Sequence, residues 1–388
     1  MSQTTEPPIL RRRKIDLPDD IVLNILTWLP AKSLIRFRCV CKPWNSSFTT
    51  PNFISTHLNN FAHAHDNDNG DGYIIHMPRH TRAMNSSNRP ICTVALDRTF
   101  DRIFDIEVPF DLPSGLSKIV GSCNGLLCLA TSTNVIYLWN PSVRKFKRLP
   151  DSGLRITGFV KLGFAYHSEN NDYKVLKILS YPWIGLNLTQ VYSLSSDSWR
   201  RVGMSLRANV KASDDSFLSL APLVSGALHW MSRVVEGEEE RKVEVIMSFD
   251  VNSEEFRMLR MPDGAMSIVR FQTRLASFKG KLAFLTFGQS EQRGAYQYSI
   301  WVMREYGVLE SWNKLFVVPL ERFSVCIAFT MCGSLLTHCH ETNNQEEKFV
   351  LVDTKTLHEK DFDIQQPLSV ATFMESLTLL DGANMVSY

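Results

Sequence analysis

The sequence lacks the long apolar runs of a membrane protein. It has 388 residues, of which 44% are hydrophobic, yet no apolar stretch reaches the roughly 18 residues that a spanning helix needs. The longest apolar-rich segment, residues 217–231, is interrupted by serine, proline and histidine. The first residues also lack the apolar centre of a signal peptide. We therefore expect a protein without a membrane span that resides in the cytoplasm, the nucleus or both.

Cysteine is also scarce, with eight residues in the whole chain and no CxxC pair. This number is too small for a disulfide-dense scaffold. Ligand-type side chains crowd together at Cys332, His338, Cys339 and His340. However, a structural zinc site needs two close pairs separated by a loop, and these residues share one strand-like segment. We expect neither a metal site nor a cofactor.

Neither sign of charge dominates the chain. Lysine and arginine number 42 against 40 acidic residues, so the formal net charge is +2. Proteins that bind nucleic acid through its phosphates usually have more basic than acidic residues. We expect no direct contact with nucleic acid. The short basic run at residues 11–14 is read either as a solvated tail or as a weak nuclear signal.

The sequence contains none of the common catalytic motifs. There is no GxSxG elbow, no GxxxxGK[ST] phosphate loop, no GxGxxG after a strand and no HExxH. Acidic pairs such as Asp214–Asp215 and Glu254–Glu255 fall in turn-like segments. Neighbouring acids on a strand would point to opposite faces and could not act together. We expect no catalytic residues and no enzyme.

Residues 16–58 differ from the rest of the chain in the spacing of their apolar residues. Ile21, Ile25 and Leu29 recur at helical spacing, and Pro30 and Pro51 interrupt the pattern. This predicts three short helices, preceded by a disordered tail at residues 1–15. The polar, glycine-containing residues 59–72 are expected to form a linker. So small a unit carries more apolar residues than it can bury, so some should face a partner.

From residue 73 to residue 388 the chain is rich in strand-like runs separated by turn residues. Three kinds of landmark recur here about 50 to 57 residues apart, or at about twice that spacing between the first two glycines. They are turn glycines (Gly125, Gly226, Gly280, Gly333), strand ends (Trp139, Tyr192, Phe249, Val302, Val352) and the aromatic residues of the next strand (Phe146, Trp199, Phe256, Trp312, Phe362). Such a period is typical of a kelch-like propeller. We predict an all-β propeller of about six blades, with a sandwich as the alternative.

The helical region resembles an F-box. The segment Ile15–Phe48 has the order of the family pattern, with two Leu-Pro pairs, Ser-Leu, an aromatic with basic residues, Val-Cys-Lys and a tryptophan. The matching residues are Leu17, Pro18, Ile25, Leu26, Leu29, Pro30, Ser33, Leu34, Phe37, Arg38, Val40, Cys41, Lys42 and Trp44.

The strand-rich region resembles the F-box-associated domain of plant-type F-box/kelch proteins. The matching segments are Gly121–Leu129, Trp139–Pro150, Gly163–Ile178, Val191–Arg200 and Leu223–Met231. The paired glycines of typical kelch repeats are missing, so the blades are degenerate.

The resemblance implies the substrate-recognition subunit of an SCF-type (SKP–cullin–F-box) ubiquitin ligase. The F-box would dock on the SKP-family adaptor, while the propeller would capture a protein substrate through residues that the sequence does not identify. A ligase-independent scaffold is the main alternative, and a propeller enzyme is less favoured. The adaptor-binding residues carried over from the family are Leu17, Pro18, Ile21, Leu26, Leu29, Leu34, Phe37, Val40, Cys41 and Trp44. Phe37 and Trp44 could equally belong to the F-box core.

Overall fold

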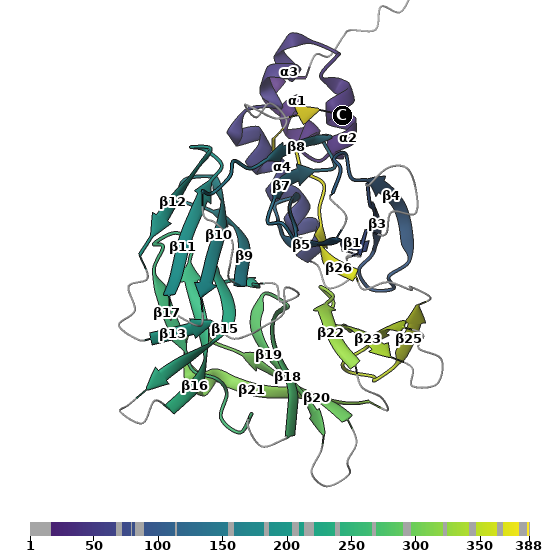
Figure 1. The fold of residues 1–388 in the computed structure, drawn as a ribbon. Coiled ribbons are helices and arrows are strands. Elements are labelled where there is room, and N and C mark those ends of the chain that lie inside the picture. Colours follow the sequence, from purple (N-terminus) through teal and green to yellow (C-terminus); the bar gives the residue numbers. More distant parts are fainter. Residues whose placement is uncertain are drawn as a thin grey trace, which may run out of the picture.

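The structure, a computed structural model, combines a small helical unit with a ring of six antiparallel sheets (Figure 1). The expected tail, residues 1–15, lies outside the described residues. The structure describes residues 17–66, 72–78, 80–81, 89–112, 115–153, 159–181, 186–203, 209–212, 221–236, 241–265, 269–289, 296–320, 324–340, 347–362, 368–379 and 386–387.

Prolines mark where the helices begin. Pro18 and Pro30 directly precede the first two helices, Pro43 lies in the first turn of the third, and Pro51 opens the fourth. Proline fits the first turn of a helix, where its missing N–H is no loss. The described part of the chain has four helices in this unit where the sequence predicted three: α1 (Asp19–Leu26), α2 (Ala31–Phe37), α3 (Lys42–Ser47) and α4 (Pro51–Asp66).

The fourth helix corrects the expected linker at residues 59–72. Residues 59–66 continue α4, and residues 67–71 lie outside the described residues. The helix is held to the unit by its apolar face, because Phe53 is buried in the same core as α1 and α2. His57 is also fully buried and donates a hydrogen bond from Nε2 to the Leu29 carbonyl oxygen at 3.0 Å. This burial lowers the pKa of His57.

The six sheets form a propeller, as the repeat predicted. Blade 1 contains β1 (Tyr73–Pro78), β3 (Ile91–Leu96), β4 (Arg102–Glu107) and β26 (Leu368–Phe373). Blade 2 contains β2 (His80–Thr81), β5 (Gly115–Cys123), β6 (Leu126–Thr131), β7 (Ile136–Asn140), β8 (Lys145–Arg148) and β27 (Val386–Ser387). Blade 3 contains β9 (Phe159–His167), β10 (Asp172–Tyr181), β11 (Leu186–Ser193) and β12 (Ser198–Val202). Blade 4 contains β13 (Asn209–Ala212), β14 (Leu223–Val224), β15 (Ala227–Glu236), β16 (Arg241–Asp250) and β17 (Phe256–Leu259). Blade 5 contains β18 (Val269–Phe278), β19 (Lys281–Gln289), β20 (Tyr296–Met303) and β21 (Trp312–Leu320), with a short 3-10 helix at Leu309–Ser311. Blade 6 contains β22 (Ser324–Phe329), β23 (Leu335–His340), β24 (Glu347–Val352) and β25 (Glu359–Phe362).

Blade 1 closes the ring with strands from both ends of the domain. The late strand β26 runs antiparallel to β1, with Tyr73 opposite Phe373 and Pro78 opposite Leu368. The hydroxyl of Ser369 also accepts a hydrogen bond from the Ile119 amide of blade 2 at 2.9 Å. Because its innermost strand comes from the far end of the chain, this blade lacks the first turn glycine of the repeat.

The sequence landmarks occupy equivalent places in successive blades. Trp139, Tyr192 and Phe249 are the second-last residues of the third strands of blades 2, 3 and 4, and each is at most 1% exposed. Each lies opposite the aromatic landmark of the fourth strand, and the Tyr192–Trp199 ring centroids are 5.4 Å apart. Such cross-strand aromatic pairs stabilise a sheet. These landmarks therefore form the blade cores, as predicted.

Glycine is required in the first hairpin turn of several blades. Asn124–Gly125, Ser225–Gly226 and Lys279–Gly280 all have positive φ at both residues. Two consecutive positive φ values are the signature of the tight hairpin turn whose twist matches paired strands, and glycine adopts the second at little cost.

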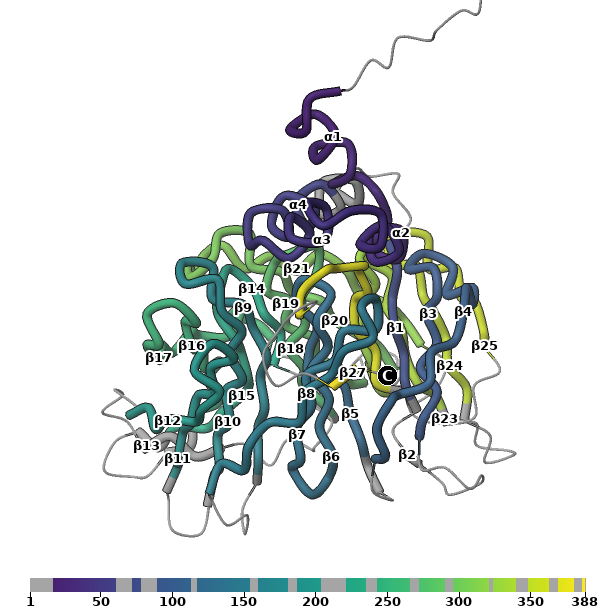
Figure 2. Tube along the Cα trace, turned by 90° about the horizontal axis from the view of Figure 1, so that it is seen from above, coloured from purple at the N-terminus to yellow at the C-terminus, as the bar shows by residue number. Residues whose placement is uncertain are grey.

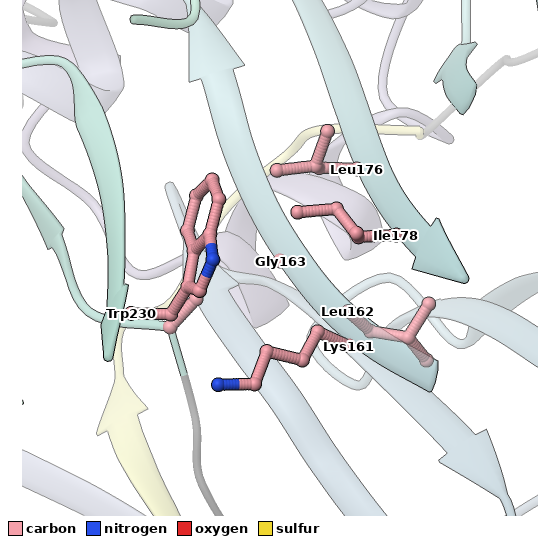
Figure 3. A pocket seen from close by; sticks show the side chains of 7 residues that line it. Lys161, Leu162, Gly163, Leu176, Ile178 and Trp230 are labelled. Carbon is pink, nitrogen blue, oxygen red and sulfur yellow. The ribbon is translucent and has the colours of Figure 1, made fainter. Parts of the chain in front are cut away.

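Blades 3 and 4 pack against each other through a close backbone approach (Figure 3). Trp230 of β15 faces Leu176 and Ile178 of β10 beside Gly163, enclosing a cavity of only about 10 Å³. A Cβ atom on Gly163 would come within 2.6 Å of Leu228 Cδ1. This cavity has room for about one water molecule, so it is a packing feature and not a ligand site.

Ion pairs also join neighbouring blades. Lys174 of blade 3 donates to Glu254 of blade 4 at 2.8 Å, and Arg200 donates to the same carboxylate. Lys147 of blade 2 pairs with Asp197 of blade 3 at 2.7 Å. In each pair the acid lies in the turn between the third and fourth strands of the next blade. The turns therefore help to fix the order of the blades in the ring.

Candidate protein-docking site

An exposed apolar stripe runs along the outer face of α1. Leu17, Ile21, Ile25 and Trp28 are 51%, 45%, 51% and 59% exposed. Ile21 and Ile25 are four residues apart and share one face of α1, while Leu17 lies two residues before the helix and Trp28 two residues after it. Val40, after α2, is 61% exposed. Large apolar side chains gathered on a surface mark an interaction site. We call Leu17, Ile21, Ile25 and Trp28 the α1 stripe.

The α1 stripe contains only part of the predicted adaptor-binding set. Pro18 is exposed beside it, and Cys41 is half-buried. Ile25 and Trp28 were not among the residues carried over from the family, although Ile25 follows Ile21 at helical spacing.

Leu26 and Leu34 correct the prediction, because they are only 4% and 0% exposed. Both point into the core of the helical unit, so they offer no surface to a partner in this conformation. Leu29, Phe37 and Trp44 are half-buried against the same core, and the rings of Phe37 and Trp44 lie 6.0 Å apart. These five residues build the platform that holds the α1 stripe in place.

The helical unit is fixed to the propeller and completes its core there. Residues 374–379, which follow β26, form a segment that we call the C-terminal strap. Leu377 of this strap is fully buried among the helices, together with Val143 from the turn between β7 and β8. Figure 2 shows the helices gathered on one face of the ring. The sequence predicted more apolar residues than the helical unit can bury by itself. Some of them pack against the strap and Val143, and others form the α1 stripe.

Blade 2 holds the strap in place through buried hydrogen bonds. The side-chain amide of Asn140 donates to the carbonyl oxygens of Ser376 and Thr378 at 3.0 and 2.7 Å. The carboxylate of Glu375 accepts a hydrogen bond from the Ala31 amide, the first amide of α2, at 2.9 Å. An acceptor there satisfies a donor that the helix itself leaves free. Helices, strap and propeller therefore form one connected unit.

The described part of the chain contains neither a cluster of metal ligands nor a membrane-spanning helix. No three histidine, cysteine or acidic side chains converge there in a way that could hold a metal ion. None of the helices described is both long and apolar enough to cross a membrane.

Comparisons with known proteins agree with this architecture. The model of the F-box associated beta propeller domain matches residues 71–370, and that of the F-box domain matches residues 15–56. The F-box protein CPR1 of Arabidopsis thaliana is 29% identical over 324 residues, covering 78% of this chain and 73% of its own length. The F-box/kelch-repeat protein At3g23880 of the same plant is 26% identical over 314 residues, covering 78% and 80%. The chain therefore belongs to the family of F-box proteins that carry an F-box associated β-propeller domain.

Proposed function

We propose that this protein is the substrate-recognition subunit of an SCF-type ubiquitin ligase. The helical unit docks on the SKP-family adaptor through the α1 stripe, and the propeller captures a protein substrate. The adaptor connects the chain to a cullin–RING ligase. The protein acts in the cytoplasm, the nucleus or both.

The α1 stripe is the observation that supports this proposal most directly. Four large apolar side chains remain about half exposed within the segment that matches the F-box domain, although the rest of the helical core is closed by the chain's own strap. Leaving such side chains in water is unfavourable, and burying each in an interface contributes about 1.5–3 kcal/mol. A stable partner is the simplest reason to retain them.

The proposed role requires no catalysis by this chain. A receptor accelerates ubiquitin transfer by raising the local concentration of its substrate near the conjugating enzyme. The fixed contact between helices and propeller suits this role, because it sets the distance between the captured substrate and the ligase.

Affinity purification of the full chain from cells treated with a proteasome inhibitor tests the proposal. The stripe variant carries Ile21→Ser, Ile25→Ser and Trp28→Ser, all at exposed positions, so the fold should persist. A matched control carries Met258→Ser, Leu315→Ser and Val317→Ser, three exposed apolar residues of the propeller. We expect the adaptor and a cullin to co-purify with the parent chain and the control, and to be lost from the stripe variant.

A ligase-independent scaffold would give a different result. It would keep its propeller partners but would not co-purify a cullin under any of these conditions. Equal recovery of adaptor with the stripe variant and the control would also contradict docking through α1.

A further inference from the structure

A wide channel passes along the axis of the propeller. It has a volume of about 1120 Å³, and all six blades contribute to its wall. This exceeds the range of roughly 300–1,000 Å³ that is usual for sites of drug-sized ligands. A chain segment can therefore enter it, whereas a small metabolite would fill only part.

Small apolar residues keep the channel open. Gly121, Ala276, Ala328 and Ala371 line it from the innermost strands of four different blades. Larger apolar side chains such as Phe164 lie between them. The innermost strands thus leave space for an apolar side chain of a ligand, and hydroxyl groups such as those of Ser122 and Thr372 also line the channel.

The mouth of the channel is cationic. Arg98 lies in the β3–β4 turn, Lys279 in the β18–β19 turn and Lys355 in the β24–β25 turn, and all three are exposed. We call these three residues the cationic rim. Five lysine and arginine residues line the whole channel against two aspartates, although the full chain has a net charge of only +2. Basic charge is therefore concentrated here.

The acids of the channel are already engaged by backbone amides. Asp97 is 2% exposed and accepts hydrogen bonds from the amides of Met331 and Cys332 at 2.8 and 3.0 Å. Asp353 accepts from the amides of Lys355 and Thr356, both at 2.8 Å. Both carboxylates thus serve to hold turns.

Two of the three rim cations are available to a ligand, whereas the Lys355 ammonium already interacts electrostatically with the Asp353 carboxylate. Within the described residues, neither Arg98 nor Lys279 forms an ion pair with a carboxylate. Deeper in the channel, the guanidinium of Arg274 donates to the carbonyl oxygens of Cys326 and Ile327, so its positive charge lies beside neutral carbonyl groups. Clefts lined by one sign of charge concentrate ligands of the other sign.

The rim lies on the face of the ring that carries the helical unit. Its turns follow the first or third strand of a blade, and so does the turn of Val143 that packs against the helices. Figure 2 shows the helices on one side of the ring. A ligand held at the rim would therefore be presented on the side of the α1 stripe.

We propose that the channel mouth binds an acidic segment of the protein substrate, with carboxylate or phosphate groups on the cationic rim and an apolar side chain in the channel. This inference rests on the proposed receptor function and gives it a substrate class. The anionic groups would meet Arg98, Lys279 and Lys355, while Arg274 supplies positive charge below them.

An array of degenerate octapeptides, each with one fixed residue, tests this site with the full chain bound to its adaptor. We expect peptides with a fixed glutamate, aspartate or phosphoserine to bind more strongly than peptides with a fixed glutamine or serine. This preference should decrease as the salt concentration rises. The variant Arg98→Glu, Lys279→Glu, Lys355→Glu should weaken the best acidic peptide about tenfold or more. The control Arg148→Glu, Arg201→Glu, Arg304→Glu makes the same charge change on exposed residues outside the channel and should bind like the parent chain.

The outcomes separate the site from the receptor function. Retention of phosphoserine peptides alone, or of all acidic peptides, supports the site and identifies its anion. No acidic preference, an equal loss in the control, or displacement of the peptides by single-stranded RNA overturns it. If the rim variant does not fold, the milder Arg98→Gln, Lys279→Gln, Lys355→Gln variant replaces it. If the chain recovers a cullin but does not select acidic peptides, only the proposed site is contradicted. If it selects acidic peptides but does not recover a cullin, only the receptor function is contradicted.

Discussion

The backbone amide of Ala31 donates a hydrogen bond to the carboxylate of Glu375, 344 residues later in the chain, at 2.9 Å. The first residue of α2 is thereby linked to the C-terminal strap, whose next residues are held by Asn140 of blade 2. A segment beyond the last propeller strand thus joins the helices to the ring. The family model of the propeller ends at residue 370, before this strap begins.

Leu377→Ala should loosen the helical unit without opening the propeller. Leu377 is fully buried among the helices, so its truncation leaves a cavity that costs about 2–5 kcal/mol. Hydrogen exchange should become faster in α1, α2 and α3, while the blades keep their protection. Val386→Ala, at a 51% exposed position, is the control. Unchanged exchange in the helices would show that the strap does not support them.

Gly125→Ala should displace the strap, whereas Gly226→Ala should not. Both glycines have nearly the same positive φ, +75° and +74°, so both substitutions carry the same backbone strain. A Cβ atom on Gly125 would lie 2.4 Å from Ser376 Cβ and 2.6 Å from the Met374 carbonyl oxygen, while one on Gly226 would meet nothing within 4 Å. Overpacking of this kind costs about 1–3 kcal/mol. Thermal unfolding should separate the two variants, and equal unfolding midpoints would contradict the tight fit.

Glu254→Gln should weaken the junction of blades 3 and 4. The Glu254 and Lys174 side chains are 13% and 9% exposed, so removing the carboxylate charge leaves a buried ammonium without its counterion. Such losses cost about 3–5 kcal/mol. Glu255→Gln is the matched control, because its partner Arg257 and Glu255 itself are largely exposed and such pairs contribute at most about 1 kcal/mol. Urea unfolding of both variants measures the difference; a similar small loss in each would refute the role of the buried pair.

The free energy of unfolding should fall as the pH drops below about 6.5. Burial lowers the pKa of His229 from 6.5 to about 4, where its Nδ1–H donates to the Pro222 carbonyl and its Nε2 accepts from Tyr306. Between these values the unfolded chain binds a proton that the folded chain does not, so stability present above pH 6.5 is lost, reaching about 3 kcal/mol at pH 4. His76 behaves similarly, because burial lowers its pKa to about 4 as well.

His229→Gln should therefore make the loss of stability with falling pH less steep, without abolishing it. Unfolding followed by circular dichroism between pH 7 and pH 4.5 measures this slope. The matched control His358→Gln makes the same change at an exposed position. A parent chain whose stability does not change over this range would argue against neutral buried histidines.

The blade repeat could be predicted from the sequence because its signals are local. Trp139, Tyr192 and Phe249 are each buried next to the end of a strand, and the turn glycines lie in hairpins that need positive φ. Blade 1 was the weakest part of the pattern, since its innermost strand follows the other three by more than 250 residues. Two strands that pair over such a distance in the chain add no landmark at the regular repeat spacing.

The docking site was only partly predictable for a different reason. Helix α1 is apolar on both faces, so spacing alone could not separate Leu26, which is buried, from Ile25, which is exposed. The choice depends on what covers each face, and here the strap residue Leu377 helps to close the inner core. The cationic rim was likewise invisible, because Arg98, Lys279 and Lys355 lie in turns of three separate blades.

Calorimetric titration of the full chain with a purified SKP-family adaptor tests the central claim most directly. The stripe variant Ile21→Ser, Ile25→Ser, Trp28→Ser should bind at least about a hundredfold more weakly than the parent chain, because three apolar contacts are lost. The propeller control Met258→Ser, Leu315→Ser, Val317→Ser should bind with the parent Kd. Equal Kd values for the stripe variant and the parent chain, with both proteins folded, would contradict the account.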